Sequence, residues 1–195
     1  MPTRIVNRKN VIKRLVINCI STGAIVPVIN CIPQIFCFPY SIKGFICKFV
    51  VFCVFSEAWF YYSHRLMHTR YFYKFHADHH AFIRGNALSA LYCSPVEMVL
   101  TNQLSVTIPY FLMGFSFWEM SVVNIITALS VIRGHSGGYF IKNLPKWLPK
   151  SVICSLDHDI HHHALDCNYG IFYILDRWHG TYQPKLTKRF SNTTS

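Results

Sequence analysis

The chain has 195 residues, of which 52% are hydrophobic and only 14% are charged, against roughly 25% charged in an ordinary soluble domain. Its formal net charge of +11 would suit nucleic acid or an anionic membrane surface, but the basic residues flank long apolar segments and form no soluble basic face. The composition therefore excludes an ordinary soluble domain, argues against a nucleic-acid partner, and predicts one membrane domain over 1–195.

Four apolar segments follow one another along the chain, and we expect each to form a helix that spans the bilayer. They cover residues 15–35, 45–63, 96–113 and 116–133. Gly114 provides the hinge of a tight hairpin between the last two. The sequence thus predicts an all-α polytopic membrane protein with about four transmembrane helices and a cytosolic helical cap over 134–195.

The basic residues predict the orientation of these helices. With the N-terminus in the cytosol and four crossings, seventeen of the nineteen Lys and Arg residues lie on the cytosolic side. Only Lys43 and Lys48 lie on the other side. Such a bias is typical of cytosolic loops. Every histidine of the chain then also lies on the cytosolic side.

Eleven histidines are gathered in short clusters. The clusters read SHRLMH at 63–68, FHADHH at 75–80 and LDHDIHHH at 156–163, and His135 and His179 stand alone. Residues at i, i+3 and i+4 share one face of a helix, so each cluster is expected to aim its imidazoles at one point.

Three such faces, together with His135, supply enough imidazoles for two metal ions, whereas one four-coordinate zinc would leave most of them unused. The spacing does not choose among iron, copper, nickel and zinc. A set of polar surface histidines is the alternative interpretation. Two repeats of H-x-x-H-H at one predicted membrane face make chance a poor account of the pattern.

Acidic residues accompany the histidines. Asp78, Asp157 and Asp159 lie within or against the clusters, where a carboxylate commonly orients a ligating imidazole. Each of them could equally be a solvated surface acid. Glu57 lies in an apolar segment two helical turns before His64, where an ionisable group is usually functional. A structural pairing of Glu57 with Lys or Arg is the equal alternative.

The order H-x-x-x-H, H-x-x-H-H, a lone His before Ser-Gly, and H-D-x-H-H resembles the fatty acid hydroxylase/sterol desaturase superfamily. The stretches ALYCSPVEM, HDIHHHALDCNYG and LDRWHGT resemble further motifs of that group, so the resemblance covers about 56–182. It implies metal ligands at His64, His68, His76, His79, His80, His135, His158, His161 and His162.

Three positions depart from the superfamily pattern. Some members have a second histidine where this chain has Tyr139. His163 is an extra residue that could replace His162 as a ligand if the register shifts. His179 stands where many members have Phe or His, and with His163 it is a possible extra ligand.

The resemblance implies an oxidoreductase that hydroxylates or otherwise oxidises a C–H bond of a lipid, of the sterol or fatty acyl class. Its cofactors would be two iron ions, with zinc possible in the isolated protein. Molecular oxygen would be the oxidant, and cytochrome b5 or a reductase would donate electrons. We expect an integral membrane protein, in the endoplasmic reticulum, with its site facing the cytosol. The alternative is a membrane metal-binding or metal-transport protein without oxygenase activity.

Overall fold

The computed structural model describes residues 8–30, 41–82, 87–135 and 155–184. These residues are mostly helical and contain no strand, as the sequence predicts. The long helices are α1 (Arg8–Asn30), α2 (Ile42–Met67), α5 (Leu104–Met113) and α6 (Phe117–Gly134). The shorter elements are α3 (Tyr73–His76), η1 (His79–Ala81), η2 (Ala87–Leu91), α4 (Pro95–Glu97), η3 (Met98–Gln103), α7 (Ser155–Ala164) and α8 (Ile174–His179).

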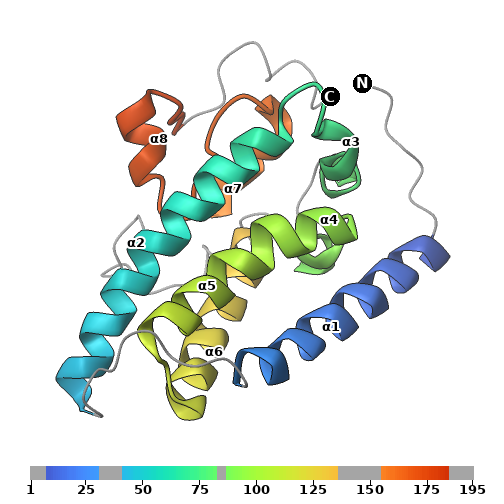
Figure 1. The fold of residues 1–195 in the computed structure, drawn as a ribbon. Coiled ribbons are helices and arrows are strands. Elements are labelled where there is room, and N and C mark those ends of the chain that lie inside the picture. Colours follow the sequence, from blue (N-terminus) through green and yellow to red (C-terminus); the bar gives the residue numbers. More distant parts are fainter. Residues whose placement is uncertain (1–7, 31–40, 83–86, 136–154, 185–195) are drawn as a thin grey trace.

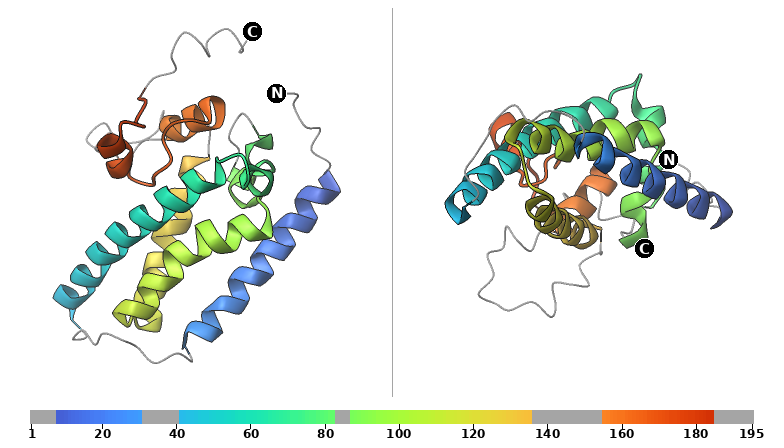
Figure 2. Two further views of the ribbon diagram at one scale, coloured as in Figure 1. Left: turned by 45° about the horizontal axis from the view of Figure 1, so that its top comes forward. Right: turned by 60° about the horizontal axis from the view of Figure 1, so that its bottom comes forward.

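The four long helices lie side by side and alternate in direction, and α3 and α7 gather at one end of them (Figure 1 and Figure 2). Helix α5 packs between α1 and α2, and α7 contacts α6. The chain therefore crosses the length of the bundle four times and returns to the α3 and α7 end after every second crossing.

Helix α2 is, within the described residues, the one helix long and apolar enough to cross a bilayer. Its 26 residues correspond to about 39 Å, which exceeds the roughly 30 Å thickness of a hydrocarbon core. The other predicted spans also fall on helical segments as far as they are described, but the number of crossings stays a prediction. The boundary of the predicted cap at 134 stays one as well.

The hairpin between α5 and α6 turns at Gly114, which confirms the predicted hinge. Gly114 adopts a left-handed conformation (φ 61°) that ends α5, and a residue without a Cβ adopts it without strain. Ser116 and Glu119 then begin α6 with a capping box, in which each side chain accepts the other's backbone N–H. Local chemistry thus fixes the turn.

The apolar core lies near this turn, at the opposite end of the bundle from α3 and α7 (Figure 1). Its buried members are Phe52, Tyr110, Met113, Phe115, Met120 and Val123. Lys48 of α2 is fully buried beside them and donates hydrogen bonds to the Glu119 carboxylate (2.9 Å) and to the Gly114 carbonyl (3.1 Å). These contacts tie α2 to the hairpin.

Helix α1 is joined to the other end of the bundle by polar contacts. Arg14 forms an ion pair with Asp78 at 3.0 Å. The buried Asn18 amide donates hydrogen bonds to the carbonyls of Leu91 and Cys93. The basic start of α1 therefore lies at the same end as the short elements that carry the histidines.

Candidate metal centre

Nine histidines converge in two adjacent groups. The first group, group A, consists of His64, His68, His76, His80 and His161. The second, group B, consists of His79, His135, His158 and His162. Within each group the candidate ligand atoms all lie within 4.8 Å of one another. The structure thus brings together all nine positions that the superfamily resemblance names, and their role as metal ligands stays a prediction.

Each H-x-x-H-H triplet is shared between the two groups, and this corrects the expectation that each cluster aims at a single point. His76 and His80 belong to group A, while His79 between them belongs to group B. The other triplet is reversed, because His158 and His162 belong to group B and His161 to group A. In α7, residues four apart point about 40° from each other around the helix, whereas adjacent residues point about 100° apart. Each triplet therefore faces two centres.

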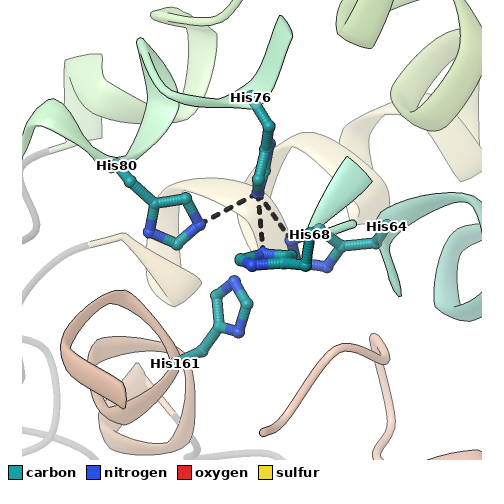
Figure 3. A group of neighbouring side chains, drawn as sticks. All are labelled: His64, His68, His76, His80 and His161. Atoms are coloured by element: carbon teal, nitrogen blue, oxygen red, sulfur yellow. Dashed lines mark hydrogen bonds between the residues drawn. The ribbon is translucent and has the colours of Figure 1, made fainter. Parts of the chain in front are cut away.

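In group A the imidazole Nε2 atoms surround a common point. His76 Nε2 lies 3.1 Å from His64 Nε2, 3.0 Å from His68 Nε2 and 2.9 Å from His80 Nε2. Figure 3 shows these rings turned toward one another, with His161 approaching from the opposite side. The rings come from α2, α3, η1 and α7, so no single element forms this group.

Group B has the same construction with one imidazole fewer. His135 Nε2 lies 2.9 Å from His158 Nε2 and 3.4 Å from His79 Nε2. His162 Nε2 lies 3.1 Å from His158 Nε2. His135, directly after α6, brings the end of that helix to the site.

Backbone carbonyls orient three of the imidazoles. The Nδ1 atom of His64 lies 2.8 Å from the Tyr169 carbonyl oxygen, and that of His161 lies 2.7 Å from the Cys167 carbonyl oxygen. His135 Nδ1 lies 2.9 Å from the carbonyl oxygen of Val131. A carbonyl accepts but cannot donate, so the proton of each neutral ring is on Nδ1 and the Nε2 lone pair points into the group.

Glu97 lies beside both groups and was missed by the sequence reasoning. Its Oε1 atom is 3.0 Å from His76 Nδ1 and 3.9 Å from His79 Nδ1, and its side chain is buried. Ser94 accepts the Glu97 N–H and so begins helix α4, which continues through the π-helical turn η3. The A-x-Y-x-x-P-x-E stretch was the signal, because it contains the one acid near Pro95.

Burial keeps these imidazoles neutral. It is the largest cause that lowers the pKa of His135 to about 4, and it holds the pKa of His79, His161 and His162 well below the ordinary value. The neighbouring imidazoles lower the pKa of the latter three further. Neutral imidazole is the form that binds metal ions, so the groups are ready to bind at neutral pH.

The donor set fits two metal ions. Metal–nitrogen bonds of about 2.1 Å place two imidazole nitrogens of one ion about 3.0–3.4 Å apart, and the Nε2 separations here are 2.9–3.4 Å. The His161 Nε2 atom is buried and has no hydrogen-bond partner. Lone pairs that face one another repel unless a cation lies among them, so the arrangement suits the predicted metal ligands.

Glu57 and Asp176 hold the segment that carries one of the orienting carbonyls. Asp176, which the sequence reasoning missed, accepts the backbone N–H groups of Tyr169 (2.9 Å) and Gly170 (2.7 Å). Glu57 accepts four more at 2.8–3.2 Å. The four donors are Ile171, Phe172, Ile174 and Leu175. Glu57 thus holds the backbone that follows the Tyr169 carbonyl, and its predicted support of the site stays a prediction.

The three predicted aspartates differ in their contacts. Asp78 pairs with Arg14, and Asp157 accepts a hydrogen bond from the Tyr182 hydroxyl at 3.0 Å. Asp159 is half-buried in α7. Their predicted support of the imidazoles stays a prediction.

The two possible extra ligands lie outside groups A and B. The ring of His179 stacks on Tyr61 with centroids 5.2 Å apart, and its Nε2 atom lies 3.1 Å from the Tyr62 hydroxyl. His163 is half-buried at the end of α7. Tyr139, which replaces a second histidine after His135, lies outside the described residues.

Comparison with known proteins identifies relatives of this chain. Residues 49–181 match the family model described as fatty acid hydroxylase. The human "Fatty acid hydroxylase domain-containing protein 2" is 34% identical over 143 residues, which cover 70% of this chain and 39% of that protein. "Sphinganine C4-monooxygenase 1" of Arabidopsis thaliana is 31% identical, covering 73% of this chain and 56% of that protein.

A third relative is "C-4 methylsterol oxidase erg25" of Schizosaccharomyces pombe, which is 30% identical over 63% of this chain and 42% of its own length. The chain thus spans about two fifths to somewhat over half of the length of these relatives. No solved structure matches it significantly.

Proposed function

Because this chain belongs to the fatty acid hydroxylase family, we propose that it binds two iron ions in groups A and B and oxidises a C–H bond of a membrane lipid. The names of its relatives support a lipid substrate, since they specify a methylsterol and sphinganine. The same names, an oxidase and a monooxygenase, support oxygen-dependent oxidation.

The observation that carries the proposal is that the imidazole Nε2 atoms converge while partners on the Nδ1 side orient the rings. Carbonyl oxygens at His64, His135 and His161 hold the proton on the outer nitrogen. We propose the same role for Glu97, whose Oε1 atom lies 3.0 Å from His76 Nδ1. Outer partners of this kind fix ring orientation and raise the basicity of a ligating imidazole.

The two groups differ in their number of imidazoles, which suggests different roles for the two proposed metal sites. Group A has five imidazoles and group B has four, so group B leaves more room for a ligand from outside the protein. Catalytic metal sites keep such an open position, whereas structural sites are filled by the protein. If both groups held iron, the residues of group B would therefore leave the more open side of the centre, where the metal pair would supply its oxygen chemistry.

When bound, a pair of iron ions supplies the redox chemistry that activates molecular oxygen. The chain's own residues exclude water from this centre, because the imidazoles of His64, His76 and His161 are buried. They also place it beside the C-terminal end of α2, within reach of a substrate dissolved in the leaflet. Cytochrome b5 or a reductase is the proposed electron donor, the endoplasmic reticulum the proposed membrane, and the cytosolic face the proposed side.

The test combines metal analysis with lipid profiling. Cells with the wild-type chain, or with the full protein if it is longer, should contain a lipid that has gained one oxygen atom or lost two hydrogens. The purified protein should hold two metal ions per chain. His161→Ala should lose the lipid product and metal content but still insert into membranes.

His179→Ala is the matched control, because His179 is outside both groups and should keep both the metal and the product. An active His161→Ala variant would contradict the proposed site. Protein that binds metals, consumes no oxygen and releases them to weak chelators would favour the metal-binding or transport alternative.

A further inference from the structure

Residues 171–178 carry large apolar side chains on their exposed surface. Ile174 is 61% exposed and Trp178 is 78% exposed, and Ile171 and Phe172 are also exposed. The segment comprises the turn before α8 and most of α8 itself, and contributes no side chain to groups A and B. A segment that faced water would place polar side chains here, so this apolar surface is expected to contact lipid or another protein surface.

The position of the segment along α2 indicates what that neighbour is. Four of its N–H groups bind Glu57, which lies ten residues, or about 15 Å, before the end of α2 at Met67. Figure 1 and Figure 2 both show α8 beside α2 and not beyond its end. The segment therefore lies at the depth of the middle of the candidate spanning helix.

The backbone N–H groups of the segment are hydrogen-bonded within the protein and do not need water as an acceptor. Six N–H groups between residues 169 and 175 donate to just two carboxylates, those of Glu57 and Asp176. Irregular backbone at membrane depth requires such internal acceptors, because lipid offers none. A loop in water would be satisfied by solvent and would gain little from two buried carboxylates.

The two charged residues of the segment both contact the protein: Asp176 is buried, and the exposed Arg177 lies along its surface. The Arg177 guanidinium lies 4.2 Å from the centre of the Tyr182 ring and donates to the Tyr173 carbonyl at 3.2 Å. Apart from Arg177, the exposed side chains among residues 171–178 are apolar.

The apolar surface is continuous with the exposed face of α2. Val54 is 66% exposed one turn before Glu57, and Tyr62 is exposed one turn beyond it. Tyr62 contacts His179 at the end of α8. Trp178 and Tyr62 lie toward the metal centre, where the membrane interface is expected, and aromatic side chains of this kind are enriched at such interfaces.

We propose that the 171–178 segment is embedded in the leaflet next to the metal centre and contacts lipid acyl chains. It would then form part of the membrane-facing wall beside the site and not part of a water-exposed cap. The proposal requires that α2 crosses the membrane. It does not require that the site binds iron.

Trp178 provides the measurement. The full chain is placed in nanodiscs whose phosphatidylcholine carries bromine on the acyl chains, and its fluorescence is compared with that of Trp178→Phe. The difference spectrum isolates Trp178. We expect its emission to be blue-shifted, to be mostly lost in brominated lipid, and to resist iodide in the aqueous phase.

Trp59→Phe gives the depth control, because Trp59 lies in α2 two residues beyond Glu57. If brominated lipid quenches neither tryptophan, α2 does not cross the membrane and the proposal fails with it. If it quenches Trp59 while iodide quenches Trp178, the segment faces water. If neither quencher affects Trp178, another protein surface covers the segment. Each of these three outcomes overturns the proposal.

Discussion

Glu97 approaches an imidazole of each histidine group, at 3.0 Å from His76 and 3.9 Å from His79. We propose that the buried Glu97 side chain orients these rings, as a carboxylate behind a ligating imidazole commonly does. Glu97 therefore lies close to both groups, because His76 belongs to group A and His79, of the same triplet, belongs to group B.

Replacing Glu97 with Gln should weaken metal binding about 10- to 100-fold, the usual cost of losing an outer partner of a ligating histidine. Chelator competition on the purified protein measures this affinity, and circular dichroism tests whether the helices persist. Asp166→Asn is the matched control, because Asp166 is exposed close to α7. Wild-type affinity in Glu97→Gln would show that the carboxylate does not orient the ligands.

At the scale of single residues, the nine histidines could be predicted because their spacing is local and repeated. The partners that orient them could not be predicted in the same way. Tyr169 and Cys167 act through their carbonyl oxygens, which no side-chain pattern reveals. The Asp176 carboxylate accepts hydrogen bonds from the backbone of Tyr169 and Gly170 and from the Thr181 hydroxyl, all within seven residues of it. No spacing pattern in the sequence marks such a role.

Among the elements, the turn at Gly170 is packed most closely by charged groups. A Cβ atom on Gly170 would lie 2.7 Å from Glu57 Oε1 and 2.9 Å from Asp176 Oδ2. Both oxygens are fixed by hydrogen bonds to the same segment, so neither can move without losing a partner. The turn thus accepts no side chain.

Gly170→Ala should loosen the segment from 169 to 179 while leaving the long helices intact. Hydrogen exchange measured by mass spectrometry should rise about tenfold or more there, since losing one hydrogen bond to a charged group costs about 1.5–3 kcal/mol. Gly23→Ala in α1 is the control, because nothing lies within 4 Å of its Cβ. That substitution should be neutral or stabilise the helix by up to about 1 kcal/mol. Equal exchange in both variants would refute the steric argument.

The runs of apolar residues predicted the long helices, and Gly114 predicted the turn between α5 and α6. The sequence did not predict the short elements. The second histidine triplet lies within α7, but the first begins at the end of α3 and continues into the 3₁₀ turn η1. Tertiary contacts decide such short elements, among them the ion pair of Arg14 with Asp78.

At the scale of the whole molecule, the two ends of the bundle are held by different chemistry. Imidazoles and carboxylates gather at one end, and an apolar core with a part-buried ion pair lies at the other. The sequence predicted the apolar segments and the end at which the histidines lie. It left Lys48 as an interruption of an apolar segment, because its partner Glu119 is 71 residues away.

Lys48→Met should lower the unfolding free energy by about 1.5–3 kcal/mol, the cost of losing a hydrogen bond to a charged group, because the part-buried Glu119 keeps its bond from the Ser116 N–H. The metal content of the protein that remains folded should not change, since the site is at the opposite end. Thermal unfolding in detergent and metal analysis measure the two quantities. Lys43→Met, at an exposed position in the first turn of α2, should change neither. Loss of metal from folded Lys48→Met would show that the two ends depend on each other.

Because each triplet contributes imidazoles to both groups A and B, the two proposed metal sites share the same stretches of backbone. His79 is adjacent in sequence to His80, and His161 to His162, so a cation that holds one ring also restrains its neighbour on the other centre. On the proposed function, occupation of either centre would prepare the second, and departure from either would loosen both. The chain should therefore fill and empty in one cooperative step, and half-filled molecules should be scarce at every stage of loading.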